Sequence, residues 1–159
     1  KYVKDIVVAT VYAEIKAEKP DVIFGISPQG NIENDMKMGA DVYSWCEAAG
    51  YVDYICPQIY WGFKHPYAKF DRVTKRWMKA AKSKKVKVYI GIAVYRAGHN
   101  TGASSSERRE WRSDANVLKK QVQYARKKGC DGFAFFDYQD LKSKTSARAV
   151  KNLKKVLKR

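Results

Sequence analysis

The stretch GYVDYICPQIYW, residues Gly50 to Trp61, decides the fold of this chain. It begins as an apolar run and ends in the polar and aromatic side chains of Gln58, Tyr60 and Trp61. A strand that is buried on both faces reads as near-continuous hydrophobicity, which is typical of a parallel sheet covered by helices. In such sheets the groups that perform chemistry lie at the carboxyl ends of the strands. The stretch therefore predicts a buried parallel strand that ends in a candidate site.

The chemistry of this strand end suits a sugar ring. The amide of Gln58 both donates and accepts hydrogen bonds, while Tyr60 and Trp61 offer flat apolar faces with one polar group each. A sugar has hydroxyls around its edge and C–H groups on its faces. Core packing of the aromatic rings is the alternative, and this stretch alone favours neither.

Apolar runs alternate with amphipathic segments along the rest of the chain, which predicts a helix followed by four consecutive β–α units. The predicted strands cover residues 21–27, 52–60, 86–94 and 131–137. The predicted helices cover residues 3–18, 41–49, 67–83, 113–128 and 143–157, with Asp41 as an N-cap, Ser113 or Asp114 as another, and Gly50 and Gly129 as stop signals. Residues 28–40 and 95–112 are predicted to be loops.

Four β–α units fit two architectures. One is an open doubly wound sheet, and the other is half of an eight-stranded β/α barrel, which typically needs about 250 residues. Periodicity alone does not choose between them. With 159 residues and 45% apolar content, the chain is long enough for one domain with a real core, so residues 1–159 are expected to form a single domain or a fragment of one.

Charge is distributed unevenly along the chain, whose net charge is +16. Residues 1–65 carry six Lys and Arg against nine Asp and Glu, whereas residues 66–159 carry 26 against seven. Most of these basic residues fall in predicted helices, which favours a solvated basic surface. The functional interpretation is attraction to a polyanion, either nucleic acid or an anionic cell-wall polymer.

Neither membrane insertion nor a disulfide framework is predicted. No run of about 18 apolar residues occurs, so we expect no membrane span. The three cysteines, Cys46, Cys56 and Cys130, are odd in number and lack metal-site spacing, which favours buried thiols. The chain opens at Lys1 without a methionine, and we expect it to be a fragment of a longer protein.

Five motifs occur in an order that resembles a known family. They are FGISPQGN (24–31), Trp45 before a glycine, GYVDYICPQIYW (50–61), YIGIAVYRAG (89–98) and DGFAFFDY (131–138). Together they resemble the C-terminal half of glycosyl-hydrolase-like family 10, which consists of bacterial β/α-barrel enzymes. The resemblance covers nearly the whole chain. It implies four parallel strands that form the C-terminal half of a TIM-type barrel.

The resemblance also implies a function and a location. The expected protein is part of a glycoside hydrolase that acts on a cell-wall polysaccharide such as peptidoglycan, in an extracellular or envelope location. The family's acidic H-F-D-D-Y motif on the fourth barrel strand is missing here, so the main catalytic acids are expected outside this chain and the chain alone is expected to be inactive. Self-association, or pairing with a missing N-terminal half-barrel, follows as an expected partner interaction.

Substrate binding is assigned to side chains at predicted strand ends. Arg96 is a candidate for a substrate carboxylate, with simple solvation as its alternative. Ser27, Gln29 and Asn31 are candidates for substrate hydroxyls, and a turn around Pro28 and Gly30 is the equal alternative. The full predicted binding set is Gln58, Tyr60, Trp61, Tyr95, Tyr138, Ser27, Gln29, Asn31 and Arg96.

Asp137 is the best carboxylate for chemistry within the chain, because it ends the last predicted strand. Glycoside hydrolysis normally needs two carboxyl groups. We expect a substrate hydroxyl contact or a supporting role for Asp137 more than acid–base catalysis. Asp53 begins its strand and is interpreted as structural, while Asp35 and Asp41 lie after the first strand.

Other chemistries lack support in the sequence. His65 and His99 have no ligand partners at metal-site spacing, and no glycine-rich phosphate loop is present, so no metal and no cofactor are predicted. No nucleic-acid-reading motif occurs, so no nucleic-acid partner is expected. The alternative to the hydrolase is a non-catalytic basic module that binds anionic cell-wall polymers.

Overall fold

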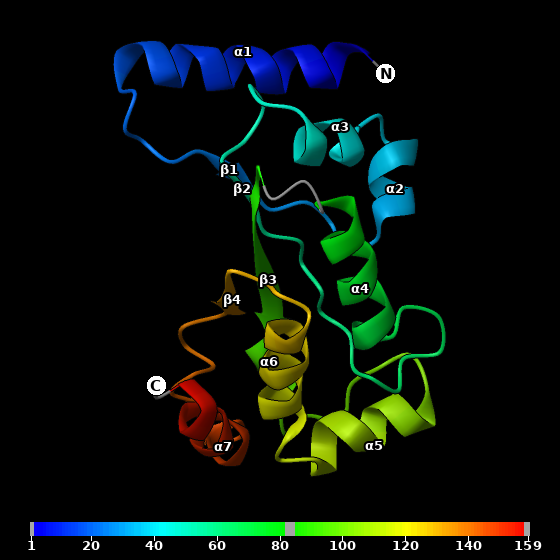
Figure 1. The fold of residues 1–159 in the computed structure, drawn as a ribbon. Helices are drawn as coiled ribbons and strands as arrows, with labels where there is room; N and C mark the ends of the chain where they lie inside the picture. The colour runs from blue at the N-terminus through cyan, green and yellow to red at the C-terminus, as the bar shows by residue number, and fades with distance from the viewer. Residues whose placement is uncertain (1, 82–84, 158–159) are drawn as a thin grey trace.

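The structure is a computed structural model that describes residues 2–81 and 85–157, with side chains described from residue 6 onward. Helices and strands alternate along the chain (Figure 1). In order, the elements are α1 (Tyr2–Glu18), β1 (Gly25–Ile26), α2 (Ile32–Lys37), α3 (Val42–Glu47), β2 (Tyr54–Ile55), α4 (Phe70–Ala80), β3 (Lys87–Ala93), the 3-10 turn η1 (Val94–Arg96), α5 (Ser105–Ser113), α6 (Val117–Lys127), β4 (Gly132–Phe136) and α7 (Ala147–Leu157).

The four strands form one parallel sheet in the order β1-β2-β3-β4, which confirms the predicted α/β class. Doubly wound sheets reverse their strand order at a switch point, where ligands bind. The sequential order found here has no such reversal. The arrangement is therefore that of half a TIM-type barrel, the alternative that periodicity left open.

The first two strands are shorter than predicted, and a proline lies shortly after each of them. Pairing between β1 and β2 is limited to two residues on each strand. Pro28 and Pro57 follow these pairs, and proline has no N–H to donate. Pairing resumes beyond the prolines as isolated bridges from Gln58 to Gln29 and to Gly91.

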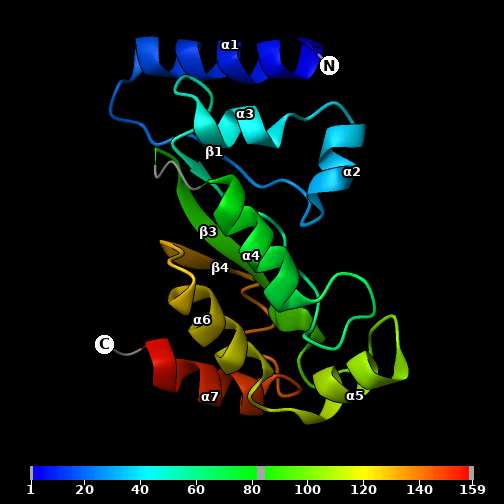
Figure 2. The same cartoon turned by 45° about the vertical axis from the view of Figure 1, so that its right-hand side comes forward.

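The core lies between the sheet and the helices α4 and α6, which stand in front of it in Figure 2. Ile55, Ile90 and Ile92 project from the strands and are fully buried. Trp77 of α4 and Leu118 of α6 are buried against them. This face therefore accounts for the apolar runs in the sequence.

The opposite face of the sheet, here called the inner face, carries tyrosines and glycines. Tyr54 and Tyr89 meet edge to face, with ring centroids 5.3 Å apart. A Cβ atom at Gly25 would lie 2.3 Å from the Tyr54 ring, and one at Gly132 would lie 2.6 Å from the Tyr89 ring. Any larger residue at these two positions would have to displace the rings.

Two predicted loops contain helices. The loop over 28–40 holds α2, where the Asn31 side chain accepts the N–H groups of Glu33 and Asn34 as an N-cap. The loop over 95–112 holds α5, capped by Ser104. The apolar content of these segments is too low for an apolar stripe at helical spacing to show in the sequence. In α5, for example, the buried residues are Glu107 and Trp111.

The predicted helix signals were partly right. Asp41 caps α3 by accepting the N–H of Ser44, as expected, and Gly129 follows α6 with a φ of +87°. Gly50 also has positive φ, but α3 already ends at Glu47. The helix predicted over 113–128 begins later, at α6, because Ser113 closes α5. Residues 82–84, the predicted end of another helix, lie outside the described residues.

Helix α1 is attached to the sheet through Asp53. This carboxylate accepts hydrogen bonds from the Tyr12 hydroxyl at 3.1 Å and the Phe24 N–H at 2.8 Å, and it pairs with Lys16 at 2.8 Å. Burial by itself would raise the pKa of Asp53, but the bonds from Lys16, Phe24 and Tyr12 together lower it below its usual value. Asp53 thus has the structural role predicted for it.

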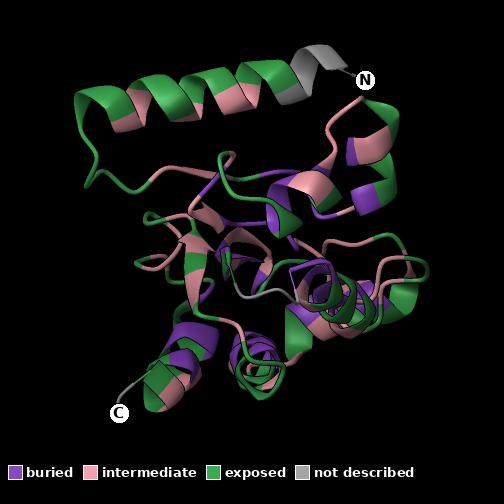
Figure 3. Ribbon diagram, turned by 45° about the horizontal axis from the view of Figure 1, so that its top comes forward, coloured by how far each residue is buried: buried purple, intermediate pink, exposed green. Residues whose placement is uncertain are grey.

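Much of the remaining surface of α1 is exposed, although Val8, Ala9 and Ile15 are half-buried (Figure 3). Ile6, Val7 and Val11 are 60%, 54% and 41% exposed.

Within residues 2–81 and 85–157, no helix has both the length and the apolar character needed to cross a bilayer.

Candidate functional site

The carboxyl ends of the four parallel strands meet at one edge of the sheet and bring two of the predicted aromatic residues, Tyr60 and Tyr95, together. The rings of Tyr60 and Phe136 stack with centroids 5.8 Å apart. Tyr95 stands edge-on to both, at 6.0 Å from Tyr60 and 6.2 Å from Phe136. Residues that follow or end β2, β3 and β4 thus form one cluster, here called the aromatic cluster.

Phe136 was missed as a site residue by the sequence analysis, which named only Asp137 and Tyr138 at the end of this strand. Side chains alternate between faces along a strand. In β4, Gly132 and Phe136 share the inner face, and Phe136 is 53% exposed. The alternation was the signal that could have identified it.

A cavity of about 560 Å³ opens over the inner face beside the aromatic cluster. This volume lies within the range of about 300–1,000 Å³ that is usual for small-molecule sites. The residues that line it belong to the four strands or directly follow them, and they include Ser27, Cys56, Tyr60, Gly91 and Phe136. Burial raises the pKa of Tyr60, with smaller contributions from Cys56 and Tyr95.

Arg96 lies against the aromatic cluster. Its guanidinium carbon is 5.6 Å from the centre of the Tyr95 ring, and its Nε donates to the Tyr95 hydroxyl at 3.4 Å. This cation–π contact keeps a positive charge at the edge of the cluster. Arg96 is half-buried and has a defined ring partner.

The polar residues after β1 and β2 are bonded to one another. The Gln58 amide donates to the Ser27 carbonyl at 3.1 Å, and the Ser27 hydroxyl donates to the Cys56 carbonyl at 2.8 Å. The Gln29 amide donates to the Met38 sulfur at 3.2 Å. The Gln58 side-chain oxygen accepts no hydrogen bond from the described residues, and Gln58 is not among the residues that line the cavity.

Trp61 and Asn31 lie apart from the cavity. Trp61 packs over Gly30, whose Cβ would lie 2.5 Å from the indole ring, and its ring is 5.9 Å from that of His65. Asn31 caps α2. The structure therefore places Tyr60 and Trp61 on different sides of one segment, and substrate contacts from Trp61 and Asn31 stay predictions.

Asp137 follows β4 directly, after a cis peptide bond from Phe136. Its Oδ1 accepts the N–H groups of Gln139 at 2.8 Å and Asp140 at 3.1 Å, which closes the turn after the strand. Tyr138 is 67% exposed, with the Lys142 ammonium 4.1 Å from its ring centre. One oxygen of Asp137 thus has a structural function, and Oδ2 is the one left for a ligand.

Asp35 is a second carboxyl group near the strand ends. It is 5% exposed, and its Oδ1 accepts the Gln29 N–H at 3.2 Å. Its Oδ2 is buried with no hydrogen-bond partner among the described residues. Burial raises the pKa of Asp35 to about 6, partly opposed by the bond from Gln29. A buried carboxyl with an unpartnered oxygen favours the protonated form.

Replacement of Asp35 by asparagine is expected to remove a pH dependence of stability. The pKa of Asp35 in the folded state is above its value in the unfolded chain. The protonated carboxyl therefore contributes its full stabilisation of the fold below about pH 4, and this contribution is lost as the pH rises through about 6. The free energy of unfolding of Asp35→Asn, measured relative to that of the parent, should therefore rise by about 1–3 kcal/mol between pH 4 and pH 7.5. Urea unfolding at several pH values measures this. The exposed Asp21→Asn is the control, and a pH-independent difference would contradict the assignment.

The segments that follow β2 and β3 are joined by Glu107. This fully buried carboxylate accepts the N–H of Gly62 at 3.0 Å, the N–H of Ala103 at 2.7 Å and the indole N–H of Trp111 at 3.3 Å. Both segments lie at the carboxyl end of the sheet. Glu107 therefore fixes the rim on which the candidate site is built.

No group of three or more His, Cys, Asp or Glu side chains suited to a metal ion occurs among residues 2–81 and 85–157. His65 Nδ1 instead accepts the backbone N–H groups of Tyr67 and Ala68. Cys56 and Cys130 carry thiols without a disulfide, and burial raises the pKa of both.

The basic residues of the helices face solvent, as predicted. The exposed ones include Arg72, Lys75, Arg76 and Lys79 of α4, Lys120, Arg126 and Lys127 of α6, and Arg148, Lys151, Lys154 and Lys155 of α7.

Comparison with known proteins gives one family match and several relatives. Residues 3–113 match the model of the family described as glycosyl hydrolase-like 10. The chain is 36% identical to glycosyl hydrolase DigH of Escherichia coli K12 over 132 residues, which cover 72% of this chain and 29% of DigH. It is 34% identical to glycosyl hydrolase YngK of Bacillus subtilis 168 over 113 residues, which cover 61% of this chain and 22% of YngK. The matches thus span less than a third of each relative.

Proposed function

Because this chain belongs to the glycosyl hydrolase-like 10 family, we propose that it is part of an enzyme that hydrolyses glycosidic bonds in a bacterial cell-wall or related polysaccharide. In this proposal the carboxyl ends of its strands bind the glycan. The observation that carries it is the convergence of Tyr60, Tyr95 and Phe136 beside a cavity of about 560 Å³. Aromatic faces and nearby amide and hydroxyl groups are the features that a sugar ring needs.

Each side chain has a distinct role in this proposal. Tyr60 and Phe136 stack on the apolar faces of sugar rings, and the Gln58 oxygen accepts a hydrogen bond from a substrate hydroxyl. Arg96 is held against Tyr95 where it can pair with a substrate carboxylate. Asp137 Oδ2 contacts a hydroxyl, since Oδ1 closes the turn.

Hydrolysis needs two carboxyl groups, about 5–5.5 Å apart in retaining enzymes and about 6.5–9.5 Å apart in inverting ones. In the part of the chain that the structure describes, the carboxyl groups near the strand ends include Asp137, whose Oδ1 closes a turn, and the buried Asp35 and Glu107. We therefore propose that the principal acids come from outside this chain. Pairing of the inner face with a second half-barrel, and an extracellular or envelope location, stay predictions.

Incubation of the purified chain with peptide-free glycan strands of peptidoglycan tests the proposal. We expect the strands to be bound and no reducing ends to be released, because a complete pair of catalytic carboxyl groups is missing. Co-sedimentation and a reducing-end assay measure the two quantities. Lack of binding at every salt concentration would overturn the proposal, and reducing ends formed in proportion to the protein would show that the chain supplies its own acids.

A second candidate function is a basic module that binds an anionic wall polymer without catalysis. The exposed Lys and Arg residues of α4, α6 and α7 support it. Binding of this kind weakens steeply with salt, whereas stacking on aromatic rings does not. The salt dependence of co-sedimentation therefore separates the two functions.

A further inference from the structure

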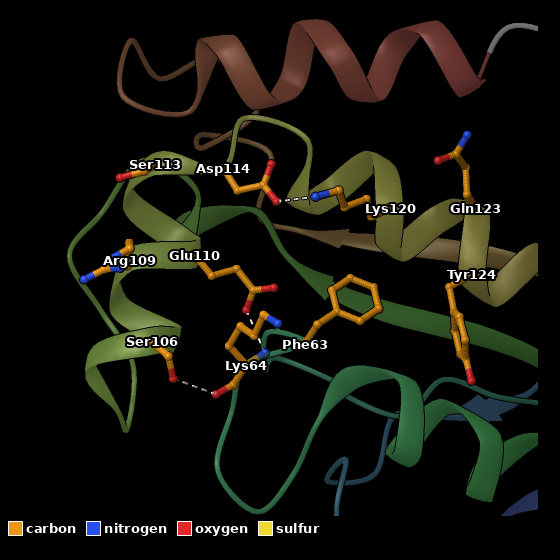
Figure 4. Close-up of a pocket in the computed structure, with 10 residues that line it drawn as sticks. All are labelled: Phe63, Lys64, Ser106, Arg109, Glu110, Ser113, Asp114, Lys120, Gln123 and Tyr124. Atoms are coloured by element: carbon orange, nitrogen blue, oxygen red, sulfur yellow. Dashed lines mark hydrogen bonds and ion pairs between the residues drawn. The ribbon is translucent and has the colours of Figure 1, made fainter.

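A larger cavity lies on the other side of the sheet, between α5, α6 and the segment that follows β2 (Figure 4). Its volume is about 830 Å³, and it is here called the outer pocket. It is lined by Phe63, Lys64, Ser106, Arg109, Glu110, Ser113, Asp114, Lys120, Gln123 and Tyr124. None of these residues was singled out as a site residue by the sequence analysis.

The walls of the outer pocket are two helix faces. On α5, Arg109 and Glu110 lie three and four positions after Ser106. Ser113 lies four and three positions after them, so all four residues are on one side of the helix. On α6, Gln123 and Tyr124 lie three and four positions after Lys120, so these residues also share one side of their helix. The pocket is thus built from the surfaces of two helices.

The floor of the outer pocket is aromatic. Phe63 and Tyr124 meet edge to face with centroids 6.2 Å apart, and Phe63 is held from below by Phe70 at 5.3 Å. Both floor residues are only partly buried. They present apolar surface to a ligand in a fixed arrangement.

Polar groups surround this floor. Glu110 reaches from α5 toward Lys64 and Phe63 (Figure 4), and its Oε2 accepts the Lys64 N–H at 2.9 Å. Asp114 and Lys120 pair at 2.6 Å. Charges of both signs therefore line the pocket, which gives no one-signed field of the kind that attracts a polyanion.

We propose that the outer pocket is a second carbohydrate-binding site, which holds uncharged β-linked sugar rings of a polysaccharide chain over Phe63 and Tyr124. Glu110 and Gln123 then bond to the ring hydroxyls. The segment after β2 carries Tyr60 to the inner-face cavity and Phe63 to the outer pocket. The inference shares its ligand class with the proposed function but not its residues.

Amide chemical-shift mapping of the chain with cellotetraose and with the β-1,4 tetramer of N-acetylglucosamine tests this site. The two probes share uncharged β-linked rings, and their comparison shows whether the acetamido group is needed. We expect shifts at Lys64, Ser106, Glu110, Gln123 and Tyr124 with at least one probe, unchanged in 0.5 M salt. If neither probe shifts these amides, the inference is wrong.

Two variants assign any binding to the pocket. Tyr124→Leu keeps apolar volume but removes the ring, and Glu110→Gln removes the charge from an acceptor, so each should weaken binding about three- to tenfold. Tyr67→Leu, at an 88% exposed position, and Glu47→Gln, on the surface of α3, are the matched controls and should have no effect. Equal losses in the controls would overturn the assignment.

The same spectra separate this inference from the proposed function. Shifts at Tyr60, Tyr95 and Phe136 without shifts in the outer pocket would leave the proposed function standing and reject the second site. Shifts in the outer pocket alone would leave the second site standing and reject glycan binding at the inner face. An absence of shifts in both regions rejects both.

Discussion

Replacement of Glu107 by alanine is expected to lower the free energy of unfolding by about 3–5 kcal/mol. The side chain is fully buried, and its carboxylate is the acceptor for Gly62, Ala103 and Trp111. Its removal leaves three donors without a partner, and each such donor costs about 1–3 kcal/mol. Relief of the desolvated charge offsets part of this loss. Urea unfolding followed by tryptophan fluorescence measures the change, with Trp111 as a reporter at the site.

Two further variants make this test specific. Glu107→Gln keeps one carbonyl acceptor but turns an NH₂ group toward a backbone donor, so an intermediate loss is expected. Glu47→Ala removes the same charge from an exposed position on α3 and should change stability by no more than about 0.5 kcal/mol. A loss below about 1 kcal/mol for Glu107→Ala would show that the segments after β2 and β3 are held by other contacts.

Replacement of Tyr60 by leucine is expected to weaken glycan binding at the inner face by about tenfold to a hundredfold. Tyr60 contacts both Phe136 and Tyr95, so it is the centre of the aromatic cluster. Leucine retains apolar volume but provides neither a flat ring nor a hydroxyl. Isothermal titration with glycan oligosaccharides at two salt concentrations measures the effect.

Tyr67→Leu is the matched control for this variant, because Tyr67 is 88% exposed and does not line the inner-face cavity. Its binding should equal that of the parent. Unchanged binding in Tyr60→Leu, together with loss of binding at high salt in both proteins, would contradict the inner-face site. That result would favour the basic-module alternative.

Local sequence patterns predicted most elements of the fold. The apolar runs located all four strands, and Asp41 and Gly129 marked helix ends where they occur. These signals depend on residues that are near one another in the chain, such as a side chain that caps an N–H three positions away. The ladder breaks at Pro28 and Pro57 have the same local origin, but they were not anticipated.

Helices with little apolar content escaped prediction. In α5 the buried positions are Glu107 and Trp111, and a buried glutamate does not register as part of an apolar face. It is buried because three donors from distant parts of the fold converge on it. Periodicity cannot reveal such a residue.

The sequence by itself determined the α/β class, the order of the elements and the grouping of Gln58, Tyr60 and Tyr95 at strand ends, because a side chain's place along its own strand is a local property. Only the tertiary structure decided the strand order β1-β2-β3-β4, the inclusion of Phe136 in the aromatic cluster, the burial of Asp35 and the outer pocket. Each of these depends on which strands and helices become neighbours. That choice is made by packing between segments far apart in the chain, which no local pattern encodes.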